Sequence, residues 1–369
     1  MSNYLNDYGL TNEINLTISS FAYQIIIEDI KNFIYKVDKS NFSKFCSIIF
    51  LSYYKEANAN FEERIEKEIN SMNEFIKTNN IKDKDTIIKF EYEYLNSKFK
   101  DELKLKKDKK DKSKKIYLDD EVVSILNCEY EQIRKYYPSH ITFFSSIIEE
   151  YARLPFFKRE RIYYKNIIDT LNKCNNNYLV DLILFNKDSN NKYINNKVYF
   201  KPYKIVTDKV DTFNYVVGFS KNVSSNSNLK KYDIRCFRLS RIKEVRVSDV
   251  KFKFNKSELS LLKEELSTKD VRFLSGTEFE FKVEFTNKGI TLLNQILYMK
   301  PSSFIKDSEN KNVYTFFCSE RQLEIYLKEF GAEAKVISPL SLKNKLKDYY
   351  LKASNLYNQE DNNNNNNNN

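Results

Sequence analysis

Four cationic side chains fall within a short stretch in the second half of the chain, and their chemistry suits phosphate. They are Arg235, Arg238, Arg241 and Lys243. A guanidinium group can hold two phosphate oxygens at once, so closely spaced arginines are typical of sites that bind polyanions. The aromatic rings of Tyr215 and Phe219 could stack on bases, or could instead fill the core of a sheet.

The same sequence offers little for catalysis or metal binding. It has a single histidine, His140, and five cysteines that stand far apart without a CxxC pair. Its five glycines cannot supply a GxGxxG or P-loop motif, because these cradles need several glycines at fixed spacing. We therefore predict no enzyme activity, no metal site and no cofactor. An odd, scattered set of cysteines indicates reduced thiols and hence a cytoplasmic protein.

Charge and hydropathy narrow the class of partner. The 369 residues carry a net charge of +10, no apolar run is long enough to cross a membrane, and the polar N-terminus lacks a signal-peptide pattern. Residues 98–115 have ten lysines against four acidic residues, and residues 199–253 have thirteen lysines or arginines against five acidic residues. This concentration indicates a polyanionic partner, although the first segment is also typical of a solvated linker.

An internal repeat occupies the N-terminal part of the chain. Residues 13–19 alternate apolar and polar side chains, which predicts a half-buried strand. Ser19 or Ser20 can cap a following helix, and Ser40 or Asn41 can begin a second one. The apolar stripe of the first helix contains Phe21, Ile25, Ile26, Ile30 and Phe33, and that of the second contains Phe45, Ile48, Ile49 and Tyr53.

The same pattern returns about a hundred residues later. Residues 116–118 predict a short strand, Asp119 or Asp120 a cap, and Pro138-Ser139 the start of a second helix. The first helix carries Val122, Val123, Leu126 and Ile133, and the second carries Phe144, Ile147, Ile148 and Tyr151. The segment FSSII at 144–148 matches FCSII at 45–49.

Strand–helix–helix is the unit of the ribbon-helix-helix fold, in which two units pair their strands into a ribbon that enters the DNA major groove. Outward strand side chains would then read bases, and backbone N–H groups at helix starts would hold phosphates. These residues are Asn15, Thr17 and Ser19, then Lys115, Tyr117 and Asp119, with Ser40, Asn41 and Ser139 at the helix starts. Two ordinary helical hairpins would give the same pattern. The sequence also leaves open whether the units pair within one chain or across a dimer.

From about residue 176 the periodicity changes to that of strands. Strands are predicted at 178–184, 198–206, 214–220, 234–239 and 245–254. Short strands at close spacing are typical of a small, SH3-like barrel.

Three of these strand segments resemble the WYL domain family. They are FKPYKIV at 200–206, NYVVGF at 214–219 and RCFRLSRIKEV at 235–245. Only Tyr215 is kept from the family's Trp-Tyr-Leu triplet, but the order of the three strands matches. The resemblance implies an Sm-like β-barrel with a basic groove that senses nucleic acid or a small anionic ligand. In this chain the groove would use Tyr215, Ser220, Arg235, Arg238, Arg241, Lys243 and Lys204.

The C-terminal part predicts a small α/β layer. Residues 278–285 alternate charged and apolar side chains, and a helix near 288–299, a strand at 313–318 and a helix at 320–330 follow. Gly331 is predicted to end that helix, before a strand at 334–337 and a final helix. Residues 330–339 and the final helix resemble the extension that follows WYL domains and supports dimerisation or ligand response. The asparagine run at 362–369 predicts a disordered tail.

The predicted fold class is thus multidomain α+β, with a ribbon-helix-helix-like helical region, a central SH3/Sm-like β-barrel (WYL) and a small C-terminal α/β layer. The predicted domains are a first unit at 1–61, a helical and Lys-rich linker at 62–114, a second unit with a connecting helix at 115–175, the barrel at 176–256, the extension at 257–357 and the tail at 358–369.

The layout over about residues 13–357 resembles the WYL accessory proteins of type VI-D, RNA-targeting CRISPR systems. That resemblance implies a regulator that binds single-stranded RNA and stimulates an effector nuclease, acting as a homodimer. A second hypothesis is a transcription regulator whose ribbon binds operator DNA and whose groove senses a nucleotide-like ligand. A third, from a different class, is a nuclease or other enzyme.

Overall fold

The computed structural model describes residues 11–33, 41–78, 87, 94, 111–129, 137, 139–175, 177–187, 193–221, 232–274 and 279–365. The chain divides into two compact units. Unit 1 contains Met1–Val216 and Phe237–Lys251, and unit 2 contains Val217–Cys236 and Phe252–Asn369. In the described part of the chain, no helix combines the length and the apolar character that a membrane crossing needs.

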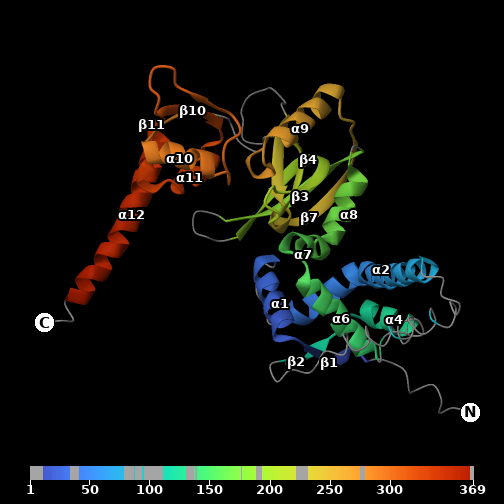
Figure 1. Ribbon diagram of the computed structural model, residues 1–369. Coiled ribbons are helices and arrows are strands. Elements are labelled where there is room, and N and C mark those ends of the chain that lie inside the picture. The colour runs from blue at the N-terminus through green and yellow to red at the C-terminus, as the bar shows by residue number, and fades with distance from the viewer. Residues whose placement is uncertain are drawn as a thin grey trace, which may run out of the picture. The chain divides into compact units, whose positions relative to one another are not determined.

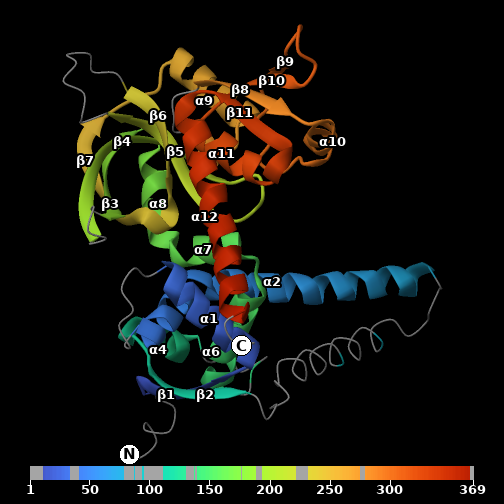
Figure 2. The same ribbon diagram turned by 90° about the vertical axis from the view of Figure 1, so that its left-hand side faces the viewer.

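Unit 1 begins with the two strand–helix–helix copies that the repeat predicts. The first copy is β1 (Glu13–Ile18), α1 (Ser20–Phe33) and α2 (Asn41–Thr78), and the second is β2 (Lys112–Tyr117), α4 (Asp120–Cys128) and α6 (His140–Arg153). Strands β1 and β2 pair antiparallel, with Asn15 opposite Lys115. Figures 1 and 2 show the four helices gathered on one side of this ribbon. The question that the sequence left open is therefore answered, because the two copies pair within one chain.

The inner face of the ribbon is apolar in the first copy and mixed in the second. Ile14, Leu16 and Ile18 are all buried, as the alternation predicts. In β2 the residue opposite Leu16 is Lys114, whose ammonium group lies 4.2 Å from the ring centroid of Phe42. A lysine stem can cover apolar surface while its charged end sits over an aromatic ring, so the second strand closes the core without a full apolar face.

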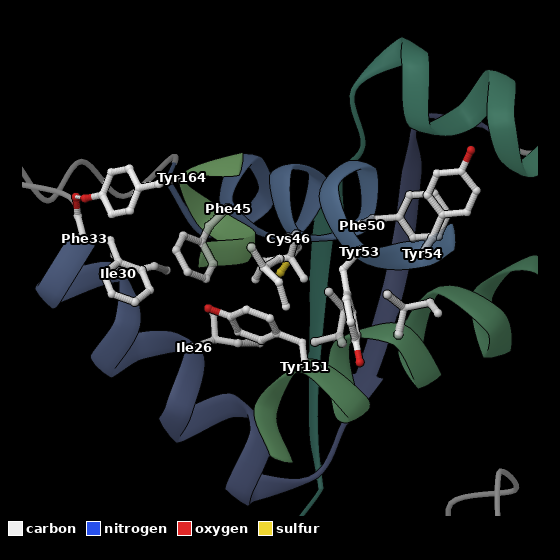
Figure 3. Packing of buried hydrophobic residues seen from close by; sticks show 14 of the residues in the cluster. Ile26, Ile30, Phe33, Phe45, Cys46, Phe50, Tyr53, Tyr54, Tyr151 and Tyr164 are labelled. Carbon is white, nitrogen blue, oxygen red and sulfur yellow. Dashed lines mark hydrogen bonds between the residues drawn. The ribbon is translucent and has the colours of Figure 1, made fainter. Parts of the chain in front are cut away.

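The helices fill this core with large aromatic side chains. Phe45, Cys46 and Tyr151 lie together at its centre (Figure 3), and the rings of Phe45 and Tyr151 meet edge to face at 6.4 Å. The stripe predicted for the first helix is partly wrong, because Phe21 is 53% exposed. Ala22 and Asp29 are buried instead, since a polar partner on another element can satisfy Asp29.

Each copy fixes the start of the other copy's first helix. The Ser19 N–H and hydroxyl both donate to Glu149 on α6 of the second copy. In return, the Asp119 N–H donates to Ser47 Oγ on α2 of the first copy, at 3.3 Å. These reciprocal bonds satisfy polar groups at strand–helix junctions and make the two copies one folding unit.

Two helices, where one was predicted, lead into the strand region. They are α7 (Phe156–Tyr163) and α8 (Lys165–Cys174). The strands follow as β3 (Tyr178–Lys187), β4 (Tyr193–Thr207), β5 (Asn214–Lys221), β6 (Tyr232–Arg238), a 3-10 turn η1 (Leu239–Arg241) and β7 (Ile242–Lys251), in the sheet order β6-β5-β4-β3-β7. Each predicted strand is present, and β3 pairs antiparallel with β4 and with β7.

Unit 2 contains the predicted α/β layer. Its elements are α9 (Lys256–Thr268), η2 (Val271–Phe273), β8 (Phe279–Phe285), α10 (Asn287–Gln295), β9 (Phe304–Lys306), β10 (Val313–Cys318), α11 (Glu320–Lys328), η3 (Gly331–Glu333), β11 (Ala334–Ser338) and α12 (Leu340–Asn365). The sheet order β11-β8-β10-β9 matches the βαββαβ arrangement of ferredoxin-like layers (Figure 2). The sequence missed α9 and β9.

Two glycines explain how this layer closes. Gly331 adopts a φ of +56°, which favours a residue without a Cβ. The prediction that it ends the preceding helix is wrong, because α11 stops at Lys328 with Glu329 as its C-cap, and Gly331 opens η3. A Cβ on Gly289 would lie 2.3 Å from the Glu333 carbonyl oxygen, so glycine lets α10 approach the backbone of η3.

The last helix is longer than the sequence predicts. Leu342 and Leu346 anchor its first turns in the core of the layer. From there α12 continues to Asn365, into the segment predicted as a disordered tail, because each added residue extends a ladder that is already nucleated. Residues 366–369 of the predicted tail lie outside the described residues.

Candidate nucleic-acid interface

The outer face of the ribbon carries the side chains predicted to read bases. Asn15, Lys115 and Tyr117 are exposed, and Thr17 is half-buried and donates to Ser113 Oγ at 3.3 Å. The Lys115 ammonium group forms an ion pair with Glu13 on the neighbouring strand. Hydrogen bonds from Lys115 and Tyr117 hold the pKa of the Glu13 carboxyl below its usual value. The face is therefore polar, and the ammonium group of Lys115 already has a carboxylate partner on the same face.

The residues predicted beside the ribbon have mixed outcomes. Ser19 was predicted to face outward, which is wrong, because its hydroxyl bonds Glu149 and accepts from the Ala22 N–H at 3.1 Å. Ser139 begins α6 as predicted, and its Oγ accepts from the Thr142 N–H at 3.1 Å. Asp119 lies at the position just before α4, as predicted, but the prediction that its side chain caps the helix is wrong, because it makes no capping bond.

Two further predicted phosphate contacts cannot be placed fully. Ser40 lies outside the described residues, and of Asn41 only the backbone, the first residue of α2, is described.

The predicted groove residues are divided between the units. In unit 1, Lys204 on β4, Arg241 in η1 and Lys243 on β7 are exposed, and Tyr215 on β5 is half-buried. The Lys243 ammonium group lies 5.7 Å from the ring centroid of Phe185. In unit 2, Arg235 is half-buried and Ser220 is only 5% exposed, which leaves the Ser220 hydroxyl little access to a ligand.

The guanidinium group of Arg238 packs against an aromatic ring and faces a buried carboxylate. The group lies 3.2 Å from the ring centroid of Phe213, and its Nε lies 3.8 Å from Glu160 Oε1 on α7. The Arg238 side chain is 28% exposed, whereas Glu160 is fully buried. Neither Arg238 Nε nor Glu160 Oε1 has a hydrogen-bond partner in the described part of the chain.

The other oxygen of Glu160 is well bound. Glu160 Oε2 accepts from the Asn214 backbone N–H at 2.7 Å and from Asn214 Nδ2 at 2.9 Å, at the start of β5. Burial raises the pKa of the Glu160 carboxyl, and the bonds from Asn214 and the charge of Arg238 oppose that rise. Glu160 thus ties α7 to the strand that carries Tyr215.

The neighbouring residue on α7 points to the helical core instead. Arg159 Nε donates to Asp29 Oδ2 at 2.7 Å and Arg159 Nη2 to Asp29 Oδ1 at 3.1 Å, which is a bidentate pair with α1. The Tyr151 hydroxyl on α6 adds a third bond to this carboxylate, at 2.8 Å. Burial raises the pKa of Asp29 against the opposing effect of Arg159.

The structure also places together charged and aromatic side chains that the sequence did not single out. On the face of the sheet opposite the core, Lys197 on β4 pairs with Asp181 on β3 at 2.7 Å and lies 4.8 Å from the ring of Tyr199. On β7, Arg246 forms a bidentate pair with Glu244, at 2.8 and 2.9 Å. The period-two pattern could have placed these residues on one face, but no motif marked them.

No metal centre emerges in the described residues, where no three His, Cys, Asp or Glu side chains lie close enough to hold an ion. None of the five cysteines takes part in a disulfide bond. Burial raises the pKa of the Cys46 thiol to about 12, so this cysteine is a core residue and a poor nucleophile.

Comparison with known proteins identifies a solved structure with a similar fold. A solved structure described as a CRISPR Cas-related protein superposes with a TM-score of 0.69 and 22% sequence identity, over 95% of this chain and 95% of that one. The two chains share a fold. At this identity the likeness concerns the architecture, and it extends over both units.

A second structure is far more distant. Proteasome accessory factor B/C (PafBC) of Arthrobacter aurescens gives a TM-score of 0.28 and 11% identity, over 63% of this chain and 35% of that chain. A TM-score this low adds nothing about the architecture. No family model and no curated protein matches the sequence.

Proposed function

We propose that this chain is a non-catalytic, nucleic-acid-binding regulator that holds single-stranded RNA on its basic strand segment, 199–253, and stimulates an RNA-targeting CRISPR effector nuclease. In this proposal the two N-terminal copies form a ribbon-helix-helix unit within the chain. The five strands form an Sm-like WYL barrel, and unit 2 carries the C-terminal extension. The shared fold with a CRISPR Cas-related protein motivates the choice of partner.

The exposure of Arg241 carries the proposal. Arg241 ends the turn η1, between the buried residues Ser240 at 3% and Ile242 at 2% exposure, so its neighbours anchor the backbone while its own residue is exposed. Lys243 follows on β7, two residues after Arg241, so the two exposed cations lie close together in the chain. A cationic side chain on an anchored backbone loses less conformational entropy on binding a phosphate than one on a flexible segment, which favours binding.

Single-stranded RNA suits this surface better than a duplex. The deep, narrow major groove of A-form RNA excludes a protein ribbon, whereas unstacked bases can reach aromatic rings such as Tyr215. The ribbon face also pairs Lys115 with Glu13, which reduces its attraction for a duplex.

The test is a salt titration of RNA binding by the double variant Arg241→Ala/Lys243→Ala. Loss of two phosphate contacts should lower the slope of log affinity against log salt by about 1.4, at about 0.7 per contact for a single strand. The matched control is Lys343→Ala/Lys347→Ala, which removes the same charge from two exposed positions on α12. Fluorescence anisotropy of a labelled RNA, measured over a series of salt concentrations, gives the affinity and its salt dependence for the double variant and for the control.

An unchanged slope in the double variant, or an equal fall in the control, would reject this surface. Addition of the chain to an RNA-targeting CRISPR nuclease assay should raise the cleavage rate, and the chain alone with RNA and Mg²⁺ should cleave nothing. We also propose that the chain acts as a homodimer, which light scattering across a concentration series tests.

A second function is favoured by the outer face of the ribbon. Exposed Asn15 and Lys115 stand opposite each other there, and both residue types contact bases in major grooves. In this alternative the chain is a transcription regulator that binds operator DNA through the ribbon and senses a nucleotide-like ligand at the basic strands. Asn15→Ala/Thr17→Ala should then weaken duplex DNA binding and leave RNA binding intact.

A further inference from the structure

Two adjacent residues of α7 connect the basic strands to the helical core. Consecutive helix residues point about 100° apart, so Arg159 and Glu160 face different neighbours. Arg159 binds Asp29 and, through it, meets Tyr151, while Glu160 binds Asn214 and faces Arg238. Both residues are buried, at 8% and 0% exposure. One short helix is therefore anchored by charge on two sides within unit 1.

The two anchors differ in how complete they are. The Arg159–Asp29 pair is closed, with two hydrogen bonds between the side chains. The Glu160–Arg238 pair stops at 3.8 Å, beyond hydrogen-bond distance, and leaves one buried polar atom on each side without a partner in the described residues. A buried carboxylate whose counter-charge is this loosely held responds strongly to any movement of that charge.

Arg238 lies over the ring of Phe213, with the buried Glu160 carboxylate near its Nε and part of its side chain exposed to solvent. It lies in the same short segment as exposed Arg241, and its own side chain is 28% exposed. A phosphate bound at that segment would draw the guanidinium outward, away from Glu160. Glu160 would then be a buried charge without its cation, which is costly, and a shift of α7 would relieve the cost.

We propose that α7 is a relay in which nucleic acid bound near Arg238 acts through Glu160 and Arg159 on the Asp29–Tyr151 cluster of the helical core. The inference rests on the proposed function, since it names how that binding site is regulated. Its two states differ in the partner of Arg238, Glu160 in the free protein and phosphate in the bound one. Because coupling is reciprocal, a change at Asp29 must alter affinity at the basic strands.

The first experiment needs no ligand. A double-mutant cycle compares urea unfolding of Asp29→Asn, Arg238→Met and the combined variant. Asp29 and Arg238 contact different sides of α7. Even so, the change in the unfolding equilibrium constant of the double variant should differ by at least about threefold from the product of the changes in the two single variants. A matched cycle with Arg241→Met in place of Arg238→Met should be multiplicative within about twofold.

If Asp29→Asn does not fold, Tyr151→Phe takes its place, because it removes only one hydroxyl from the same cluster. A cycle with Arg238 that is multiplicative, like the control, overturns the relay whether or not RNA binds.

The second experiment measures transmission. Asp29→Asn should change the affinity for a short single-stranded RNA by roughly fivefold or more, although Asp29 is buried in the helical core. Arg161→Gln, which removes an exposed charge from the same helix, should change it by less than about twofold. Hydrogen exchange of α1 should respond to RNA in the native protein and lose that response in Glu160→Gln.

The outcomes separate the two proposals. RNA that binds natively, with no effect of Asp29→Asn and no change in α1 exchange, overturns the relay and leaves the proposed function standing. If the native chain binds no RNA, the proposed function fails, and the unfolding cycle alone decides whether α7 couples its two sides.

Discussion

The ribbon face and the contact between α7 and the strands each place a carboxylate beside a cation, with opposite consequences. On the ribbon, Glu13 and Lys115 are both exposed and their pair is closed. Under the strands, Glu160 is buried and its pair with Arg238 stays open at 3.8 Å. The pKa of Glu13 is lowered by its partners, and the pKa of Glu160 is raised by burial.

This difference shows which charge pair can carry information. An exposed closed pair contributes little to stability, because water and salt compete for both groups. Water cannot solvate a buried charge whose partner moves away, so a buried ion pair without a hydrogen bond forces the protein to rearrange when one member moves. Each contact pairs one carboxylate with one cation, so it is burial that separates the passive surface pair from the responsive one.

The largest expected effect breaks the closed buried pair that anchors α7. Arg159→Ala leaves Asp29 buried without its cation and should destabilise the fold by about 3–5 kcal/mol. Urea unfolding measures this free energy, and Arg161→Ala on the exposed side of α7 is the control. Equal losses in the two variants would mean that the Asp29 contact does not hold the helix.

The next prediction uses the opposite pKa directions of the two carboxylates. The Glu160 carboxyl has a higher pKa in the folded protein than in the unfolded chain. The free energy of unfolding of the native protein, relative to that of Glu160→Gln, should therefore fall as pH rises from about 4.5. Glu13 binds them less tightly, so native stability relative to Glu13→Gln should fall as pH drops through the lowered pKa. Unfolding curves between pH 3 and 7 compare the signs, and two slopes of one sign would contradict the contrast.

A smaller effect concerns binding at the ribbon. Glu13→Gln removes the acidic partner of Lys115, so affinity for duplex DNA should rise by about the fewfold expected for one exposed charge, and single-stranded RNA binding should not change. Parallel titrations with a duplex and a single strand of the same sequence test this. A matching rise for RNA would place RNA on the ribbon.

The smallest effect is a change in thiol labelling that reports whether the helical core stays closed. Cys128 is exposed and should react rapidly with a thiol reagent, whereas Cys46 should resist, since burial raises its pKa to about 12. In Arg159→Ala, labelling of Cys46 should accelerate as the core opens. Mass spectrometry of digested protein resolves the two sites, and rapid native labelling of Cys46 would contradict its buried position.

Periodicity predicted most of the fold because the folded chain obeys the same burial rule. Ile14, Leu16 and Ile18 alternate in the sequence and are buried in β1. The predicted burial of Phe21 is wrong, because helical periodicity does not show which edge of an apolar stripe packs against another element. The burial of Asp29 was not predicted, since a buried carboxylate is favoured only when a cation such as Arg159, about 130 residues away, supplies the opposite charge.

The candidate site was harder to predict. Arg241 and Lys243, predicted as groove residues, are exposed in the structure, and their predicted contact with nucleic acid stays a prediction. The Glu160–Arg238 contact was missed, because no pattern in one segment shows that a distant helix presents a buried acid. The sequence placed Arg238 and Arg241 in one motif as equals. The structure gives them different neighbours, because Arg238 ends a strand over Phe213 and Arg241 lies in a turn.

The pairing of β1 with β2 inside one chain has a consequence for how the ribbon assembles and what it can match. A ribbon made by two separate chains forms only at protein concentrations that support dimerisation, whereas two strands of one chain pair independently of protein concentration. Two identical strands also impose twofold symmetry on whatever they touch. Here one strand is EINLTI and the other KSKKIY, so the DNA target of the alternative proposal need not be a palindrome, and each half of the ribbon is free to diverge.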